Sequence, residues 1–247
     1  MKVCWNITSR CNRNCKYCFK FTKSDLSLED NIRILKKLVM MGVEKISWTG
    51  GEPFLYEDFI KLLKLSKESG IVNHVNTNTS LLNYDLLKEC LPYIDKINIS
   101  LDFIDDKLNS KYDIGENYYE HVKRIFGYIK ELNPKVKIQI NTVIFNGNIN
   151  HYKDLYNEIC KYNINYWKII RFFPVRGKAL KEELNLSITD EEFDNVCSWI
   201  RNKKTNFKVI IHGLKEMKEK HFIVLSSGEL VCSENLEDIV IDEKIYC

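Results

Sequence analysis

Three cysteines near the N-terminus, Cys11, Cys15 and Cys18, lie at C-x3-C-x2-C spacing in one short stretch. Thiolates this close in sequence can reach one soft metal centre, either zinc or an iron–sulfur cluster. A structural zinc site takes four ligands, usually as two C-x2-C pairs, and neither a second pair nor paired histidines follow. A [4Fe–4S] cluster normally takes four cysteines, so three ligands would leave one iron open for chemistry. The remaining alternative is three free thiols.

The stretch resembles the signature of the radical S-adenosylmethionine (SAM) superfamily, in which an aromatic residue follows the second or third cysteine. Tyr17 and Phe19 match that pattern. The resemblance implies a [4Fe–4S] cluster on the three cysteines and SAM bound through its amino and carboxylate groups to the open iron. It also implies that Phe19 is a cofactor-binding residue.

A second motif, Gly50-Gly51-Glu52-Pro53, follows the next expected strand. In parallel β/α folds the working residues lie at the C-terminal ends of strands, and glycines allow the backbone to approach a ligand closely. The motif matches the superfamily's GGEP element, which implies that Gly50, Gly51, Glu52 and Pro53 flank the methionine end of SAM, with Glu52 accepting from its ammonium. Taken alone, the tetrapeptide is an ordinary turn.

Polar residues also end the third and fourth expected strands. Thr77 and Asn78 can hydrogen-bond a ribose diol, or they can form an Asx-type turn. Ser100 occupies a position that in the superfamily contacts the SAM ribose or carboxylate. We therefore predict that Thr77, Asn78 and Ser100 bind the cofactor.

Three residues of the fifth and sixth expected strands are candidates for substrate contact. Asn141 shares a face with Gln139 that we predict to be the barrel interior, although a buried Asn with internal partners is equally a structural residue. Lys168, like Lys45 on the second strand, lies where helices cover the outer face, so an inward lysine facing an anionic ligand is expected. Arg171 is a further candidate, but its odd spacing from Lys168 places the two on opposite faces unless a bulge intervenes.

Apolar strand-like runs alternate with amphipathic helical stretches along the chain, a pattern that predicts parallel β/α units. The last helix opens with a Thr189-x-x-Glu192 capping box. We expect strands over 3–8, 44–49, 71–77, 96–101, 136–145 and 166–173, and helices over 28–41, 57–69, 85–91, 118–132, 151–162 and 189–203.

Six such strands are too few for a closed eight-stranded barrel, so the predicted class is α/β with a partial (β/α)6 barrel, the fold that the superfamily resemblance also implies. Short late strands are expected over 207–211, 222–225 and 230–232. We predict a core over 1–204 and a β-containing extension over 205–247 that packs on it.

The composition excludes several classes. The 247 residues are 45% hydrophobic and 29% charged, typical of a globular protein, and the net charge of +3 is too small to indicate nucleic-acid binding. No apolar run approaches the ~20 residues that span a bilayer, no signal peptide is evident, and nine scattered cysteines do not suggest disulfides. We expect a cytoplasmic protein with no membrane or nucleic-acid partner.

The chain also resembles the viperin family of radical SAM nucleotide dehydratases. The matching pieces beyond the superfamily motifs are Met41-Gly-Val-Glu-Lys45-Ile, Gln139-Ile-Asn141-Thr-Val-Ile144, Trp167-Lys168 and Asp190-Glu-Glu-Phe193. Two positions depart from that family, which has a lysine in place of Gln139 and an Arg-bearing segment in place of Asp113-Ile114-Gly115.

The resemblance implies that Lys45 and Lys168, with Arg171, hold a nucleoside triphosphate and that Asn141 contacts the reacting substrate. It implies abstraction of the 4′-hydrogen of CTP, GTP or UTP by a 5′-deoxyadenosyl radical and loss of the 3′-hydroxyl as water. The product would be a 3′-deoxy-3′,4′-didehydro nucleotide, made in antiviral or anti-phage defence with electrons from a flavodoxin- or ferredoxin-type donor.

Two other functions remain open. Radical SAM enzymes that modify peptides or activate glycyl-radical enzymes form one class, whose members usually carry a Cys-rich C-terminal domain, and Cys232 and Cys247 are all that this chain offers. A non-catalytic cluster-binding module is the other, but it would leave the GGEP element and the polar strand ends without a purpose.

Overall fold

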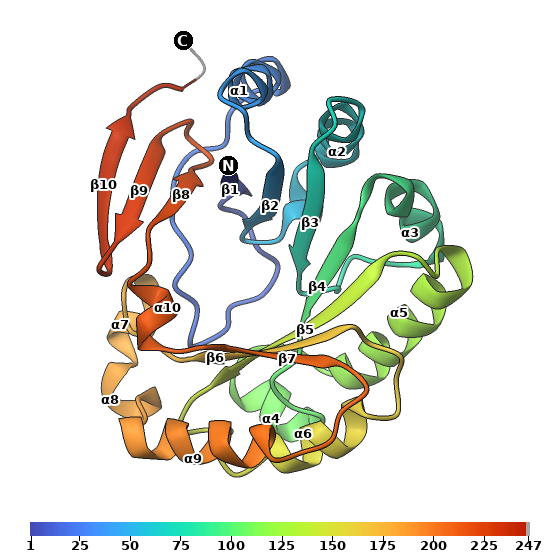
Figure 1. Cartoon of the computed structure of the whole chain (residues 1–247), viewed down its shortest axis with the longest axis vertical. Helices are drawn as coiled ribbons and strands as arrows, with labels where there is room; N and C mark the ends of the chain where they lie inside the picture. The colour runs from blue at the N-terminus through green and yellow to red at the C-terminus, as the bar shows by residue number, and fades with distance from the viewer. Residues whose placement is uncertain (246–247) are drawn as a thin grey trace.

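One ten-stranded sheet forms the centre of the protein, whose computed structural model describes residues 1–245 (Figure 1). Its order is β10-β9-β8-β1-β2-β3-β4-β5-β6-β7, with every neighbour from β8 through β1 to β7 parallel and β9 and β10 antiparallel. The strands are β1 (Lys2–Thr8), β2 (Lys45–Gly50), β3 (Val72–Thr77), β4 (Lys96–Ser100), β5 (Lys137–Ile144), β6 (Tyr166–Arg171), β7 (Lys208–His212), β8 (His221–Val224), β9 (Leu230–Glu234) and β10 (Glu237–Asp242).

The parallel strands curve into an open barrel whose outer face is covered by helices (Figure 1). β7 and β8 occupy the two edges of the parallel part and do not pair among the described residues, so the barrel has a seam there. The helices are α1 (Leu28–Met40), α2 (Phe59–Glu68), α3 (Tyr84–Cys90), α4 (Asp106–Lys111), α5 (Tyr118–Leu132), α6 (Tyr152–Ile159), α7 (Gly177–Lys181), α8 (Glu183–Leu186), α9 (Asp190–Arg201) and α10 (Leu214–Met217), with 3-10 turns at Pro53–Leu55 and Leu91–Tyr93.

Alternation along each strand separates an apolar outer face from a polar interior. Trp5, Trp48 and Trp167 are fully buried on the outer face, where Trp48 packs on Phe59 of α2 and Trp167 on Tyr156 of α6. The alternate residues face inward and include most of the lysines, amides and histidines of the strands. A barrel with this pattern buries its core between the sheet and the helices and leaves a polar channel inside.

The predicted α/β class and the open, barrel-like sheet are confirmed, with strand bounds within two residues of those expected. The parallel part has eight strands and not six, because residues 208–212 and 221–224 join its two edges as β7 and β8. Division into a core and an extension stays a prediction. Among residues 1–245, no helix is both long and apolar enough to cross a bilayer.

Candidate active site

The three cysteines lie in the loop that leaves the C-terminal end of β1. Burial, together with the nearby charges of Asp102, Cys18 and Cys11, raises the pKa of the Cys15 thiol to about 12. Burial also raises the pKa of Cys11, which lies close enough to Cys18 to influence it electrostatically. The three thiols therefore share one partly buried space, and only a strong positive centre such as iron would hold them as thiolates.

A cluster fits this arrangement better than a single metal ion. No three or more His, Cys, Asp or Glu side chains within residues 1–245 converge on one ion position. A [4Fe–4S] cluster has no such requirement, because its thiolates ligate different irons. Cys232 is buried in β9, and Cys247 lies outside the described residues.

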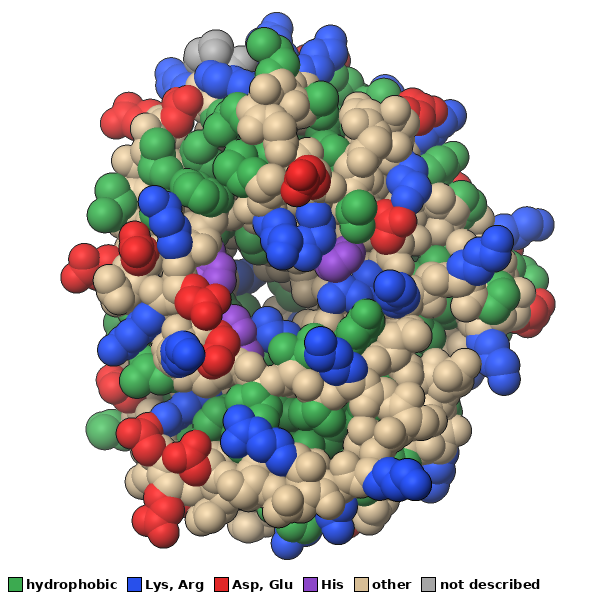
Figure 2. Space-filling model, in the orientation of Figure 1, with side chains coloured by type: hydrophobic (Ala, Val, Ile, Leu, Met, Phe, Trp, Pro, Cys, Tyr) green, Lys and Arg blue, Asp and Glu red, His purple; other side chains and the backbone are tan. Residues whose placement is uncertain are grey.

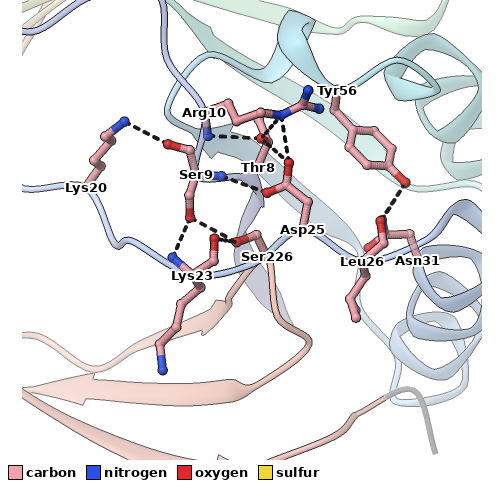
Figure 3. Close-up of polar contacts among 10 residues, drawn as sticks. All are labelled: Thr8, Ser9, Arg10, Lys20, Lys23, Asp25, Leu26, Asn31, Tyr56 and Ser226. Atoms are coloured by element: carbon pink, nitrogen blue, oxygen red, sulfur yellow. Dashed lines mark hydrogen bonds and ion pairs between the residues drawn. The ribbon is translucent and has the colours of Figure 1, made fainter.

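A set of polar contacts ties the beginning of the cysteine loop to its end (Figure 3). Asp25 accepts hydrogen bonds from Thr8 Oγ1 at 2.6 Å, from the Ser9 backbone N–H at 3.0 Å and from Arg10 Nε at 3.0 Å. The Ser9 hydroxyl lies 3.1 Å from that of Ser226, which follows β8. These contacts close residues 8–25 into one loop over the end of β1.

A second anchor comes from Tyr17, inside the cysteine motif. Its hydroxyl donates to Asp102 Oδ2 at 2.5 Å, and the Val143 backbone N–H donates to Asp102 Oδ1 at 2.7 Å. The Asp102 carboxyl is 4% exposed, and burial raises its pKa to about 6. Sequence reasoning missed this anchoring role, although Asp102 lies two residues beyond the end of β4.

The GGEP turn packs directly beneath the cysteine loop. Gly51 N–H donates to Thr8 O and Glu52 N–H to Arg10 O, both at 2.8 Å. A Cβ at Gly51 would lie 2.0 Å from Arg10 O and 2.8 Å from Cys11 Cβ, so only glycine fits. Gly50 needs glycine as well, because its φ is +145°. The two glycines thus bring the turn against Cys11, as a cofactor site at this position requires.

The carboxylate of Glu52 is fully buried and already has partners. It accepts from Thr77 Oγ1 at 2.8 Å and from the Asn78 backbone N–H at 2.7 Å, and burial raises its pKa to about 7. In this arrangement Glu52 ties the turn to the end of β3, and Thr77 is turned toward Glu52 and away from the interior. Each carboxylate oxygen has a second lone pair, so Glu52 could accept from the SAM ammonium while it keeps both of these bonds. Pro53 is buried beside it at the start of a 3-10 turn.

The other predicted cofactor residues lie at different distances from the thiols. Asn78 Nδ2 lies 3.7 Å from Cys11 Sγ, which places this side chain against the loop itself. Ser100 faces the interior beside Asn141 on the neighbouring strand. Phe19 is 40% exposed, and the guanidinium carbon of Arg176 lies 6.0 Å from its ring centroid. Direct cofactor contact by Phe19, Thr77, Asn78 and Ser100 stays a prediction.

The predicted substrate residues divide between the two faces of the sheet. Asn141 and Lys168 are register partners on β5 and β6 and face the interior, and Lys45 lies further down at the N-terminal end of β2. Arg171 is different, because its guanidinium binds Asp190 and donates to Ile188 O at 2.8 Å beside α9. This placement on the helix side of β6 corrects the expectation that Arg171 faces substrate, and odd strand spacing is the reason.

Sequence reasoning missed an inward cation, Lys96 on β4. Its ammonium donates to Gln139 Oε1 at 2.6 Å, and Gln139 Nε2 donates to Asn141 Oδ1 at 2.6 Å. Burial, together with the nearby charges of Lys45, Lys168 and Lys137, lowers the pKa of Lys96 to about 8. The signal was available in the sequence, since Lys96 alternates onto the same face as Asn98 and Ser100.

Positive charge therefore concentrates in the half of the barrel interior that lies away from the cysteine loop. Figure 2 shows Lys, Arg and His side chains gathered around a hollow at the centre of this view. Burial and neighbouring lysines lower the pKa of His74 to about 3, and burial and Lys168 lower that of His212 to about 4, so both rings are neutral at pH 7. The interior attracts anions through its lysines.

The chain is similar to known radical SAM proteins. The Radical SAM superfamily model matches residues 5–170. An S-adenosylmethionine-dependent nucleotide dehydratase of Lacinutrix mariniflava is 28% identical over 92% of this chain and 49% of its own length. A dehydratase of the same name from Flammeovirga pacifica is 28% identical over 94% and 82%. The chain thus spans about half the length of the first relative and most of the second.

A GTP 3′,8-cyclase of Clostridium perfringens is 29% identical over 75% of this chain and 59% of its own length. Among solved structures, Streptococcus suis SuiB bound to S-adenosylmethionine has a TM-score of 0.73 at 19% identity, covering 93% of this chain and 59% of SuiB. The structure of anSMEcpe with bound AdoMet and a peptide has a TM-score of 0.71 at 19% identity, covering 97% and 78%. These two likenesses show a shared fold.

The family match and the site agree. A loop with three cysteines at the required spacing lies at the C-terminal end of the first strand, and a glycine turn that tolerates no side chain packs beneath it. Superfamily members use a [4Fe–4S] cluster and SAM. The chain belongs to the radical SAM superfamily and is an enzyme of that type.

Proposed function

We propose that this enzyme dehydrates a ribonucleoside triphosphate, CTP, GTP or UTP, to its 3′-deoxy-3′,4′-didehydro form, in the manner of the viperin family. The observation that carries the proposal is the set of inward ammonium groups on Lys45, Lys96 and Lys168. None of them has a carboxylate within ion-pair distance in the described part of the chain. A polyanion such as a triphosphate would supply the missing negative charge.

The names of the sequence relatives point to the same class of substrate. Nucleotide dehydratases match more than nine-tenths of this chain, and GTP 3′,8-cyclases match about three-quarters of it. Both names describe chemistry on a nucleotide. The antiviral role that the resemblance implies, and electron delivery by a flavodoxin- or ferredoxin-type donor, are parts of the same proposal.

The groups that would bind cofactor, sugar and phosphates follow one another along the barrel axis. Cys11, Cys15 and Cys18 would hold the cluster, and the GGEP turn would bind SAM beside it; together these groups supply the radical that abstracts hydrogen from the substrate. Lys168, Lys96 and Lys45 would hold the phosphates below. Asn141 lies two residues beyond Gln139 along β5, ~7 Å at the rise of a strand, and would orient the sugar between the phosphates and the cofactor.

The test is a substrate screen on anaerobically reconstituted protein with SAM, a reductant and each ribonucleoside triphosphate in turn. We expect one or more triphosphates to stimulate 5′-deoxyadenosine formation and to yield a product lighter by one water. If no triphosphate raises 5′-deoxyadenosine above the SAM-only background, the dehydratase function is wrong and a peptide library becomes the next screen.

A cyclase is the second candidate that a specific observation favours, namely the similarity to GTP 3′,8-cyclase. The same experiment separates the two activities by mass. Cyclisation of GTP onto its own base leaves the mass of the nucleotide unchanged, whereas dehydration lowers it by one water.

A further inference from the structure

We infer that Lys96 is a substrate-positioning residue, which through Gln139 fixes Asn141 as a hydrogen-bond donor to the nucleotide and adds a third cation to the phosphate site. The inference rests on the proposed function and deepens it. Three strands contribute: Lys96 comes from β4, and Gln139 and Asn141 come from β5 with Lys168 beside them on β6.

The direction of the hydrogen bonds follows from the chemistry of the first group. A lysine ammonium can only donate, so the atom of Gln139 that faces it at 2.6 Å must be the carbonyl oxygen. The amide nitrogen of Gln139 then points to Asn141 at 2.6 Å, and the atom that it meets must be an acceptor, Oδ1. Lys96 thereby sets the orientation of both amides.

This order leaves Asn141 with its Nδ2 free of any bond to the described residues, whereas its Oδ1 is taken. Asn141 therefore presents a donor, suited to a hydroxyl or phosphate oxygen. If Lys96 were absent, both amides could rotate by half a turn, and Asn141 could equally present an acceptor.

The surroundings of Lys96 show that its charge is not balanced within the chain. Some lysines on the outside have carboxylate partners, as in Lys67 with Asp95 at 2.5 Å and Lys161 with Glu158 at 2.5 Å. Within residues 1–245, the contacts of the Lys96 ammonium are instead the Gln139 carbonyl and the ring of Tyr166, whose centroid lies 5.2 Å away. A partly buried cation held by neutral groups is stabilised when an anion arrives.

A separate observation marks the same surface as a ligand site. Asn98, 4% exposed, lies between Asn76 and Gln139 in the sheet register, and its Oδ1 has no hydrogen-bond donor among the described residues. The Asn98 Nδ2 donates a hydrogen bond to Asn76 Oδ1 at 3.0 Å. A buried acceptor without a donor is expected to bind a donor on the ligand, such as a ribose hydroxyl.

Lys96 and Gln139 meet at one place inside the barrel. The ammonium of Lys96 contacts the Gln139 side chain, so a lysine at position 139 would carry its charge to nearly the same place. A swap of the two residues should therefore preserve binding.

The experiment uses reconstituted protein with SAM but without reductant, so that calorimetry measures binding of the preferred nucleoside triphosphate and of its parent nucleoside without turnover. Lys96→Met should weaken triphosphate binding at least ~10-fold and nucleoside binding much less. The double variant Lys96→Met/Gln139→Lys should return the triphosphate Kd to within about threefold of wild type. Lys130→Met, on the exposed face of α5, is the matched control.

The positioning role is read separately with Gln139→Leu, which keeps the Lys96 charge and breaks the link to Asn141. We expect kcat to fall while the triphosphate KM stays near wild type, a division that a merely structural defect would not produce. Thermal unfolding checks the fold, and Lys96→Arg, which keeps a donor-only cation, should retain most binding.

The outcomes distinguish the two proposals. A wild-type protein that prefers no triphosphate over its nucleoside overturns the proposed function together with this inference. A wild-type protein that does prefer the triphosphate, alongside a Lys96→Met variant with unchanged Kd or a swap variant as weak as Lys96→Met, overturns this inference alone.

Discussion

The two halves of the barrel interior differ in charge and in how completely their polar groups are satisfied. At the cysteine end, Glu52 and Asp102 are buried and each carboxylate oxygen accepts a hydrogen bond. At the other end, Lys45, Lys96 and Lys168 have no ion-pair partner in residues 1–245. The polar groups of the first region are already held in place by hydrogen bonds, whereas the lysines of the second region would be stabilised by a bound anion.

The difference in charge indicates which ligand suits each half. SAM carries a sulfonium and an ammonium, so a site edged by carboxylates suits it, and a triphosphate suits the lysines. If SAM binds at the cysteine end and a nucleoside triphosphate binds through its phosphates at the lysine end, the two ligands would meet near Ser100 and Asn141.

The largest effect is expected from Cys15→Ala. Removal of one thiolate should prevent assembly of a stable cluster and abolish SAM cleavage, while triphosphate binding by the lysines persists because Cys15 lies at the opposite end. Iron content, 5′-deoxyadenosine formation and calorimetric binding are the three measurements. Cys160→Ala, at the end of α6, is the control. A Cys15→Ala protein that still forms 5′-deoxyadenosine would show that the cluster has other ligands.

Glu52→Ala comes next. It removes the acceptor for Thr77 Oγ1 and the Asn78 N–H and releases the GGEP turn from β3. Loss of the charge-assisted hydrogen bond that the SAM ammonium would donate to Glu52, worth about 1.5–3 kcal/mol, should weaken SAM binding roughly 10- to 150-fold. Iron content should be unchanged.

Equilibrium dialysis with labelled SAM measures this effect. Thr77→Val serves as a partial version, since it removes one of the two bonds and should weaken SAM binding less. Unaltered SAM affinity in Glu52→Ala would contradict the role of Glu52 at the cofactor end.

Lys168→Ala alters the other half. Its ammonium is half-buried beside Asn141, so its loss should raise the triphosphate KM at least ~10-fold, about 1.4 kcal/mol. SAM cleavage uncoupled from substrate should survive, because the cysteine end is untouched. Steady-state kinetics with the preferred triphosphate provide the test, and a KM equal to that of wild type would remove Lys168 from the substrate site.

The smallest effect is a pH dependence of triphosphate binding. Burial and the charges of Lys45, Lys168 and Lys137 hold the pKa of Lys96 at about 8, below its unfolded value, and a bound anion would raise it again. Binding should therefore take up a proton near pH 8, and affinity should fall about threefold from pH 7.5 to 8.5.

Calorimetry in buffers of different ionisation enthalpy detects the proton directly. His74 and His212 also face this region, but their lowered pKa values keep them neutral across that range. Lys96→Met should remove the proton uptake, and persistence of the uptake in that variant would assign it to another group.

The sequence predicted best what depends on local pattern. The capping box at Thr189 and Glu192 is present at the start of α9, as its sequence pattern predicts. The same linear pattern could not show that Asp102 and Tyr17 meet, or that Lys96 touches Gln139, because such contacts depend on the register between strands. Arg171 differs, because simple alternation along β6 already places it on the face opposite Lys168, beside α9.

Short elements were missed for a physical reason as well. The helix α4 has only six residues, and its stability comes from Asp105, whose carboxylate caps the N–H groups of Lys107 and Leu108. The edge strand β10 is largely exposed and lacks the apolar alternation of a buried strand. Neither carries a hydrophobic period long enough to detect.

The pairing of β1 with β8 has a consequence for the order in which the molecule can assemble. The strand that leads into the cysteine loop gains its second neighbour from Ile223 and Val224, more than two hundred positions later in the chain, and Ser226 then contacts Ser9. Contacts this distant in sequence form late because their loop-closure cost is high. During synthesis, the cysteine loop would stay incompletely supported until residues 221–226 have emerged, so metal loading is expected to follow their synthesis.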